Sequence, residues 1–180
     1  RSMSPIIILV GLLFALLASR RLDPHEVRWA IVAYVFHVVS SFGQYAVQEY
    51  YYGISDAHSY MDAGVLISRL LDIDVVRFGP EVLRLMLHLE SEIPGDIFGA
   101  GASTGTMSAI AGVLVYTFGP SLLSACLATT IVSWFGQLCL YRVARSELTG
   151  DQRRAAMWGC LFVPSAVFWG AAFSKEGIVM

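Results

Sequence analysis

The stretch WAIVAYVFHVVSSFGQYAV, residues 29–47, decides the class of this protein. It contains no Asp, Glu, Lys or Arg, and it has Trp29 at one end and Tyr45 near the other. About 20 consecutive apolar residues in a helix cross the hydrocarbon core of a bilayer, and aromatic residues collect at the two membrane–water interfaces. We therefore predict a membrane-spanning helix here, with His37 as a hydrogen-bonded packing residue inside it.

The composition of the whole chain agrees with a membrane class. Of the 180 residues, 56% are hydrophobic and 14% are charged, whereas about a quarter of the residues in a soluble domain are charged. A net charge of −2 lacks the basic footprint of a nucleic-acid-binding protein. The three cysteines lie in apolar runs without a C-x-x-C pair, so the sequence predicts no zinc or redox site.

Four further apolar segments cover residues 5–18, 103–118, 122–141 and 155–173, the last interrupted by Pro164. Together with residues 29–47 they predict an all-α, polytopic transmembrane bundle of about five spans, forming a single membrane domain. The bilayer is the predicted partner. The chain begins with Arg1 rather than Met, and we expect it to be the N-terminal part of a longer protein.

Residues 48–102 form the only long polar excursion between these segments. One helix is predicted from Ser55 or Asp56 to Leu71, with Tyr60 and Ile67 on its apolar stripe. A second is predicted over residues 80–93, between Pro80 and the Pro94-Gly95 pair. It is too short and too charged to span, so we expect an amphipathic helix in the plane of the membrane interface.

The predicted spans also imply a topology. Five alternating crossings place the basic segments 19–28 and 142–154 on opposite sides of the membrane, with three arginines in the first and four in the second. The positive-inside rule then weakly favours a cytoplasmic excursion.

Polar side chains gather in one place within the excursion: Asp56, His58, Tyr60 and Asp62 fall within seven residues. A partly desolvated carboxylate at Asp56 suits a general base that acts on a hydroxyl or amide. His58 and Asp62 share a helix face at i, i+4 spacing, but two ligands are too few for a metal site. The alternative reading of Asp56 is a helix cap.

A second unusual pair, Lys175 and Glu176, follows the Pro-interrupted segment. A lysine at the end of a membrane helix is costly unless it pairs or faces water or phosphate. Two interpretations stay open, namely a snorkelling ion pair and a point charge for a lipid-linked phosphate.

Three stretches together resemble a family of bacterial polytopic membrane proteins related to the GT-C superfamily of glycosyltransferases, of the protein-mannosyltransferase and aminoarabinose-transferase kind. The matching patterns are G-x-x-DA-x-x-Y from Gly53, GT…VY…GPS from Gly105, and PS-x-x-FW-x-x-x-x-x-KE from Pro164. Their order and spacing cover residues 29–180.

The resemblance implies many membrane helices in the bacterial inner membrane and a first extracytoplasmic loop over residues 48–102, against the charge count. It implies Asp56 as the catalytic base and a polyprenyl-phosphate-linked sugar as donor, with Tyr60 and Lys175-Glu176 in matching motif positions. We add His58 to the substrate-binding candidates because it shares the first loop. No cofactor is expected.

Two alternatives to a glycosyltransferase remain. The family pattern often has a second acidic residue directly after the Asp, and Ala57 stands there, which favours a non-catalytic subunit of polysaccharide assembly or export. The third hypothesis is a rhomboid-type serine protease using Ser103 in a Gly-rich segment. All four histidines precede Ser103, whereas such enzymes pair the serine with a later histidine.

Overall fold

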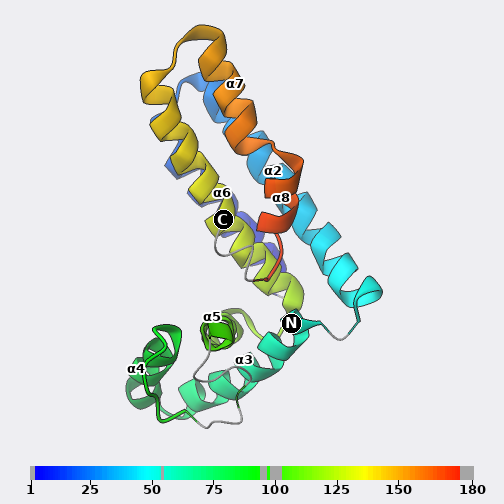
Figure 1. Cartoon of the computed structure of the whole chain (residues 1–180), viewed down its shortest axis with the longest axis vertical. Coiled ribbons are helices and arrows are strands. Elements are labelled where there is room, and N and C mark those ends of the chain that lie inside the picture. Colours follow the sequence, from blue (N-terminus) through cyan, green and yellow to red (C-terminus); the bar gives the residue numbers. More distant parts are fainter. Residues whose placement is uncertain (1–2, 54, 94–96, 98–102, 175–180) are drawn as a thin grey trace. The chain divides into compact units, whose positions relative to one another are not determined.

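A computed structural model describes residues 3–53, 55–93, 97 and 103–174, and every secondary-structure element in these residues is a helix. The prediction of an all-α fold is confirmed. The chain divides into two compact units (Figure 1). The first, here called the bundle, holds Ser4–Val47 and Cys126–Met180, and the second, here called the loop unit, holds Gln48–Ala125 with the first three residues.

The bundle consists of α1 (Ser4–Ser19), α2 (Pro24–Ala46), α6 (Leu122–Glu147), α7 (Gly150–Leu161) and α8 (Pro164–Gly170). Neighbouring helices along the chain run in opposite directions, except that α8 continues the direction of α7. The hydroxyl of Tyr34 on α2 donates to the Ile8 carbonyl on α1. The indole of Trp134 on α6 donates to the Ala30 carbonyl on α2. Helices α7 and α8 continue one after the other and run parallel to α2. The ring centroids of Trp158 and Trp29 are 4.9 Å apart, and the two rings are tilted by 56°.

The interior of the bundle is partly polar and its outside is strongly apolar. Trp134, Leu138 and Tyr141 are buried in the core, but so are several polar side chains: Ser19, Glu26, His37, Ser41, Gln44, Thr130, Ser133 and Gln137. Large apolar side chains are exposed on every long helix, for example Leu9 at 66%, Val39 at 63% and Val132 at 65%. A soluble bundle has the opposite arrangement, so this polarity agrees with a lipid environment.

Two helices are long and apolar enough to cross a membrane, Pro24–Tyr51 with 28 residues and Leu122–Glu147 with 26. The predicted five spans are not confirmed, because α1 and α5 have only 16 residues each. The last predicted span is split into α7 and α8 at Val163, which is extended. The ring of Pro164 disfavours helical backbone in the residue before it, and Pro suits the first position of the new helix.

The loop unit is built from α3 (Asp56–Ile73), α4 (Val75–Met86) and α5 (Ser103–Phe118). The predicted stripe on α3 is confirmed, since Tyr60, Gly64, Ile67 and Leu71 are all buried. A Cβ added at Gly64 would lie 2.8 Å from the Ala111 backbone of α5. The two helices therefore touch at small residues, which permit the close approach of their backbones.

The predicted helix over residues 80–93 is wrong in its boundaries. The helix begins earlier because the Asp74 carboxylate accepts hydrogen bonds from the backbone N–H groups of Val76 and Arg77, both at 3.0 Å. It ends earlier because His88 adopts a left-handed conformation with φ 58°. The Leu89 N–H then closes the end of the helix by donating to the Arg84 carbonyl at 2.9 Å.

The predicted topology is also wrong. The basic segments 19–28 and 142–154 meet at the same end of the bundle, because Arg153 and Arg145 both contact Asp23. The five-span count is not confirmed at α5, which belongs to the loop unit. Within the bundle, α6 runs back toward the start of α2. This end carries every arginine of the bundle's described residues: Arg20, Arg21, Arg28, Arg142, Arg145, Arg153 and Arg154.

Candidate functional site

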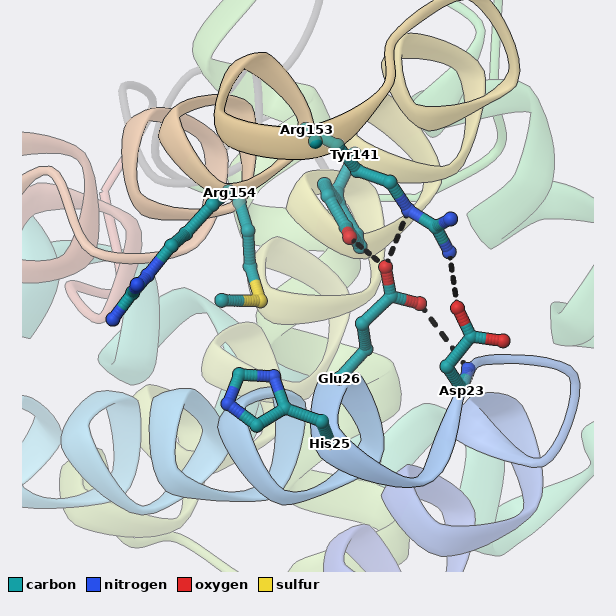
Figure 2. Close-up of a pocket in the computed structure, with 8 residues that line it drawn as sticks. Asp23, His25, Glu26, Tyr141, Arg153 and Arg154 are labelled. Atoms are coloured by element: carbon teal, nitrogen blue, oxygen red, sulfur yellow. Dashed lines mark hydrogen bonds and ion pairs between the residues drawn. The ribbon is translucent and has the colours of Figure 1, made fainter.

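A charged cluster joins three helices at the arginine-rich end of the bundle, and Figure 2 shows most of its side chains. Glu26 in the first turn of α2 is only 7% exposed. Its Oε1 accepts a hydrogen bond from the Tyr141 hydroxyl on α6 at 2.5 Å. The same oxygen lies 2.6 Å from Nε of Arg153 on α7. The carboxylate therefore links α2, α6 and α7.

The other acidic member of the cluster is Asp23, which precedes α2. Its carboxylate accepts from Nη2 of Arg153 at 2.6 Å and from Nη2 of Arg145 at 3.4 Å. Its backbone N–H donates to Oε2 of Glu26 at 3.2 Å, which completes a capping box at the start of α2. Two carboxylates face two guanidinium groups, so these four residues are electrically balanced.

The electrostatics of the cluster favour a permanently charged state. The Glu26 carboxylate raises the pKa of the Arg153 guanidinium above its usual value, and the Tyr141 hydroxyl makes the next largest contribution. The Glu26 carboxylate is held by a phenol, a backbone N–H and two guanidinium groups. A carboxylate surrounded by donors in this way is a structural anion rather than an available proton acceptor.

A pocket of about 360 Å³ opens beside the cluster. Its lining combines the charged groups with the side chains of His25 and Arg154 (Figure 2). The His25 ring accepts a hydrogen bond from the Trp29 indole at 3.2 Å. The exposed Arg154 has no ion pair within the part of the chain that the structure describes. The pocket thus offers cationic rather than nucleophilic chemistry.

Sequence reasoning missed this cluster. Glu26 follows Asp23 by three residues, which is the spacing of a capping box. That local signal was available. The partner Arg153 lies 130 residues away from Asp23, and nothing in the local sequence identifies it.

Polar groups from α2 and α6 also meet in the middle of the bundle. The Ser41 and Thr130 hydroxyls are 2.5 Å apart, and both residues are fully buried. Gln44 donates to the Phe168 carbonyl of α8 at 3.0 Å. His37 is also fully buried, with Nδ1 2.9 Å from the Ala33 carbonyl. The Nδ1 contact agrees with the interpretation of His37 as a hydrogen-bonded packing residue, and that role stays a prediction.

The residues predicted around Asp56 lie at the beginning of α3 in the loop unit. Ser55 takes the N-cap position and Asp56 is the first helical residue, exposed to solvent. Among the residues that the structure describes, the Asp56 carboxylate forms no hydrogen bond or ion pair. An anion in the first turn is favoured by the helix dipole, so Asp56 has a stabilising role there whether or not it reacts.

His58 does not pair with Asp62 as its spacing suggested. Its Nε2 lies 3.1 Å from the Glu49 carboxylate, and its Nδ1 lies 3.0 Å from the Ser55 hydroxyl. Tyr60 is buried at 1% exposure, which places its ring in the core of the loop unit. Of the two predicted binding residues near Asp56, His58 is partly exposed and Tyr60 is buried.

The other predicted binding residues, Lys175 and Glu176, lie outside the described residues. Among the residues that are described, no group of three or more His, Cys, Asp or Glu side chains can hold a metal ion. The chain has no significant match among protein families, curated proteins or solved structures.

Proposed function

We propose that this chain is part of an integral membrane protein whose bundle crosses the bilayer. Two helices of sufficient length and apolar character support this proposal. The polarity of the bundle supports it further, because Ser41, Gln44 and Thr130 are buried while Leu9 and Val39 face outward. Buried polar pairs of this kind hold membrane helices together when the surrounding lipid supplies no hydrophobic driving force.

The distribution of arginines supports an orientation for the bundle. Seven arginines and four acidic residues, Asp23, Glu26, Glu147 and Asp151, occupy one end, which leaves a surplus of three positive charges. The positive-inside rule assigns this end to the cytoplasm. If α2 spans the membrane, the residues after Tyr51 begin on the opposite side. The charge argument and the family resemblance then agree on an extracytoplasmic Asp56.

We further propose a GT-C-type glycosyltransferase activity in cell-envelope glycan assembly. The observation that carries it is the Asp56 carboxylate, which is exposed and forms no hydrogen bond or ion pair among the described residues. It stands at the start of α3, a few residues after the aromatic stretch Tyr50–Tyr52. In the reaction Asp56 takes the proton of the acceptor hydroxyl. The acceptor oxygen then bonds to the anomeric carbon as the bond to the polyprenyl phosphate breaks, with inversion. Lys175 is the proposed contact for that phosphate.

The test uses the full-length protein in vesicles that contain a radiolabelled polyprenyl-phosphate sugar. Asp56→Asn removes the proton acceptor, and the rate of transfer falls by about 10²-fold or more if it acts as the general base. Asp62→Asn is the matched control, since it removes an exposed acid from the same helix. Equal rates for the wild type and Asp56→Asn would remove Asp56 from the mechanism.

A second candidate function is a non-catalytic membrane subunit of glycan assembly or export. The specific observation in its favour is Ala57, which is 5% exposed. A second carboxylate at this position would be buried in the loop unit rather than presented to a substrate. Binding of the lipid-linked sugar without transfer, in a preparation that contains the full chain, distinguishes this function from the first.

A further inference from the structure

A second, more basic pocket lies at the arginine-rich end of the bundle. Its volume is about 500 Å³, and it is lined by four arginines and one serine: Arg21, Arg142, Arg145, Ser146 and Arg153. These residues come from the segment after α1, from the last turns of α6 and from the first turn of α7. Three separate parts of the chain thus direct cationic side chains toward one space.

The charge balance of this pocket is positive. Arg145 and Arg153 are neutralised by Asp23 and Glu26. Arg21 and Arg142 form no ion pair among the residues that the structure describes, and no acidic residue lines the pocket. Two uncompensated positive charges therefore face a space large enough for a phosphate group and its substituents.

The pocket is organised before any ligand binds. Nη2 of Arg142 donates to the Ala18 carbonyl near the end of α1 at 2.6 Å. Nη1 of Arg145 donates to the Arg21 carbonyl at 3.3 Å. These bonds hold two guanidinium groups in fixed positions, and a planar guanidinium presents paired donors that match phosphate oxygens. Less side-chain entropy is then lost on binding.

Exposed aliphatic side chains lie within a few residues of the pocket's arginines in the chain. Leu16 and Leu17 in the last turn of α1 are 46% and 47% exposed. Leu140 and Val143 on α6 are 60% and 70% exposed. A small anion that is free in solution gains nothing from contact with apolar side chains. A lipid places its phosphate among the arginines and its acyl chains along the aliphatic side chains.

We propose that this pocket binds the phosphate of an anionic glycerophospholipid from the leaflet at the arginine-rich end. The proposal rests on the membrane location proposed above, but not on glycosyl transfer or on Asp56. Basic pockets between membrane helices on the cytoplasmic side are suited to acidic head groups. The bound lipid would join the end of α1 to α6 and α7, and so stabilise the bundle.

The experiment measures thermal unfolding of the full chain in a neutral detergent while lipid is added. The three probes are phosphatidylglycerol, phosphatidylcholine and inorganic phosphate. We expect phosphatidylglycerol to raise the unfolding temperature in a saturable way and phosphatidylcholine to leave it unchanged. Stabilisation by inorganic phosphate at equal potency would overturn the lipid assignment, and no stabilisation by any probe would overturn the site.

Single arginine substitutions test whether phosphatidylglycerol binds in this pocket. Arg21→Gln removes a side chain without an ion pair, so the protein is expected to fold, and the apparent affinity for phosphatidylglycerol should fall about tenfold. Arg142→Gln should weaken binding at least as much. Arg28→Gln is the control, because Arg28 is an exposed arginine at the same end that does not line the pocket. Equal affinities for Arg21→Gln and Arg28→Gln would refute the proposal.

The membrane location is tested separately by fractionation of the expressing cells. If the chain is recovered without detergent in the soluble fraction, the proposed membrane location fails. If it is membrane-bound but indifferent to phosphatidylglycerol, only the lipid site fails.

Discussion

Replacing Glu26 by Gln tests whether the charged cluster holds the arginine-rich end of the bundle together. The substitution keeps the size of the side chain and removes its charge. An amide N–H₂ then replaces one carboxylate oxygen, so a donor faces the guanidinium groups of Arg145 or Arg153. The Tyr141 hydroxyl loses its charged acceptor.

The expected magnitude follows from the burial of these groups. Breaking a buried ion pair by removing one partner costs about 3–5 kcal/mol. The side chains of Arg145 and Arg153 are 21% and 28% exposed, and both keep Asp23 as a partner, so we reduce the cost to about 2–3 kcal/mol. For a chain of this size each kcal/mol shifts the unfolding temperature by about 2–4 °C. We expect a decrease of about 4–12 °C.

The assay is thermal unfolding of the purified chain in detergent, followed by circular dichroism. Asp151→Asn is the matched control, since Asp151 is an exposed acid at the same end of the bundle, and it should shift the unfolding temperature by less than about 2 °C. Tyr141→Phe removes only the hydroxyl and should cost about 1.5 kcal/mol. If Glu26→Gln is no less stable than Asp151→Asn, the cluster does not stabilise the bundle.

Three further predictions concern the loop unit. Gly64→Ala places a Cβ 2.8 Å from the Ala111 backbone and should cost about 1–3 kcal/mol in chemical unfolding. Gly136→Ala on α6 is the control, because an added Cβ there meets no atom within 4 Å, and it should be neutral or stabilising. The Glu92 N–H donates to the Glu81 carboxylate at 2.9 Å and lowers the pKa of Glu81. The contact therefore stabilises the fold at a pH above the pKa that Glu81 has in the unfolded chain. This stabilisation is lost as the pH falls through the lowered pKa of Glu81 in the folded protein. Amide-exchange protection of Glu92 should therefore fall at acidic pH, and protection that stays constant to pH 2 would contradict the assignment. Asp74→Ala removes the side-chain cap of α4 and should lower the free energy of unfolding by about 1 kcal/mol. The loss is measured by chemical unfolding of the full chain, followed by the helical circular-dichroism signal.

Several elements could be predicted because their signals are local. The apolar run before Gly119-Pro120 predicted a helix over residues 103–118, and α5 has these bounds. The helix at residue 56 followed from Ser55-Asp56 and from the 3.6-residue period of its apolar positions. By contrast, α4 was predicted to begin at Pro80. The side chain of Asp74 supplied a cap earlier in the chain, and the helix accommodates Pro80 in its interior.

The candidate sites divide in the same way. The sequence singled out Asp56 and His58 because they are close in the chain, but it paired His58 with Asp62 on the basis of helical spacing alone. The structure pairs His58 with Glu49, which lies in the π-helical turn Val47–Tyr51. A register that depends on a local π turn cannot be obtained from the period of a regular helix.

The sequence by itself determined that this chain is helical and that long parts of it are apolar enough for lipid, because helix formation and hydrophobicity depend on neighbouring residues. Only the tertiary structure decided which ends of those helices meet. Glu26 and Arg153 look like two unrelated charges in the sequence, and their ion pair exists because the packing of α2, α6 and α7 brings the two side chains within 2.6 Å. The count of five spans is not confirmed for the same reason, since the length and composition of α5 do not tell whether it crosses a membrane or packs on α3.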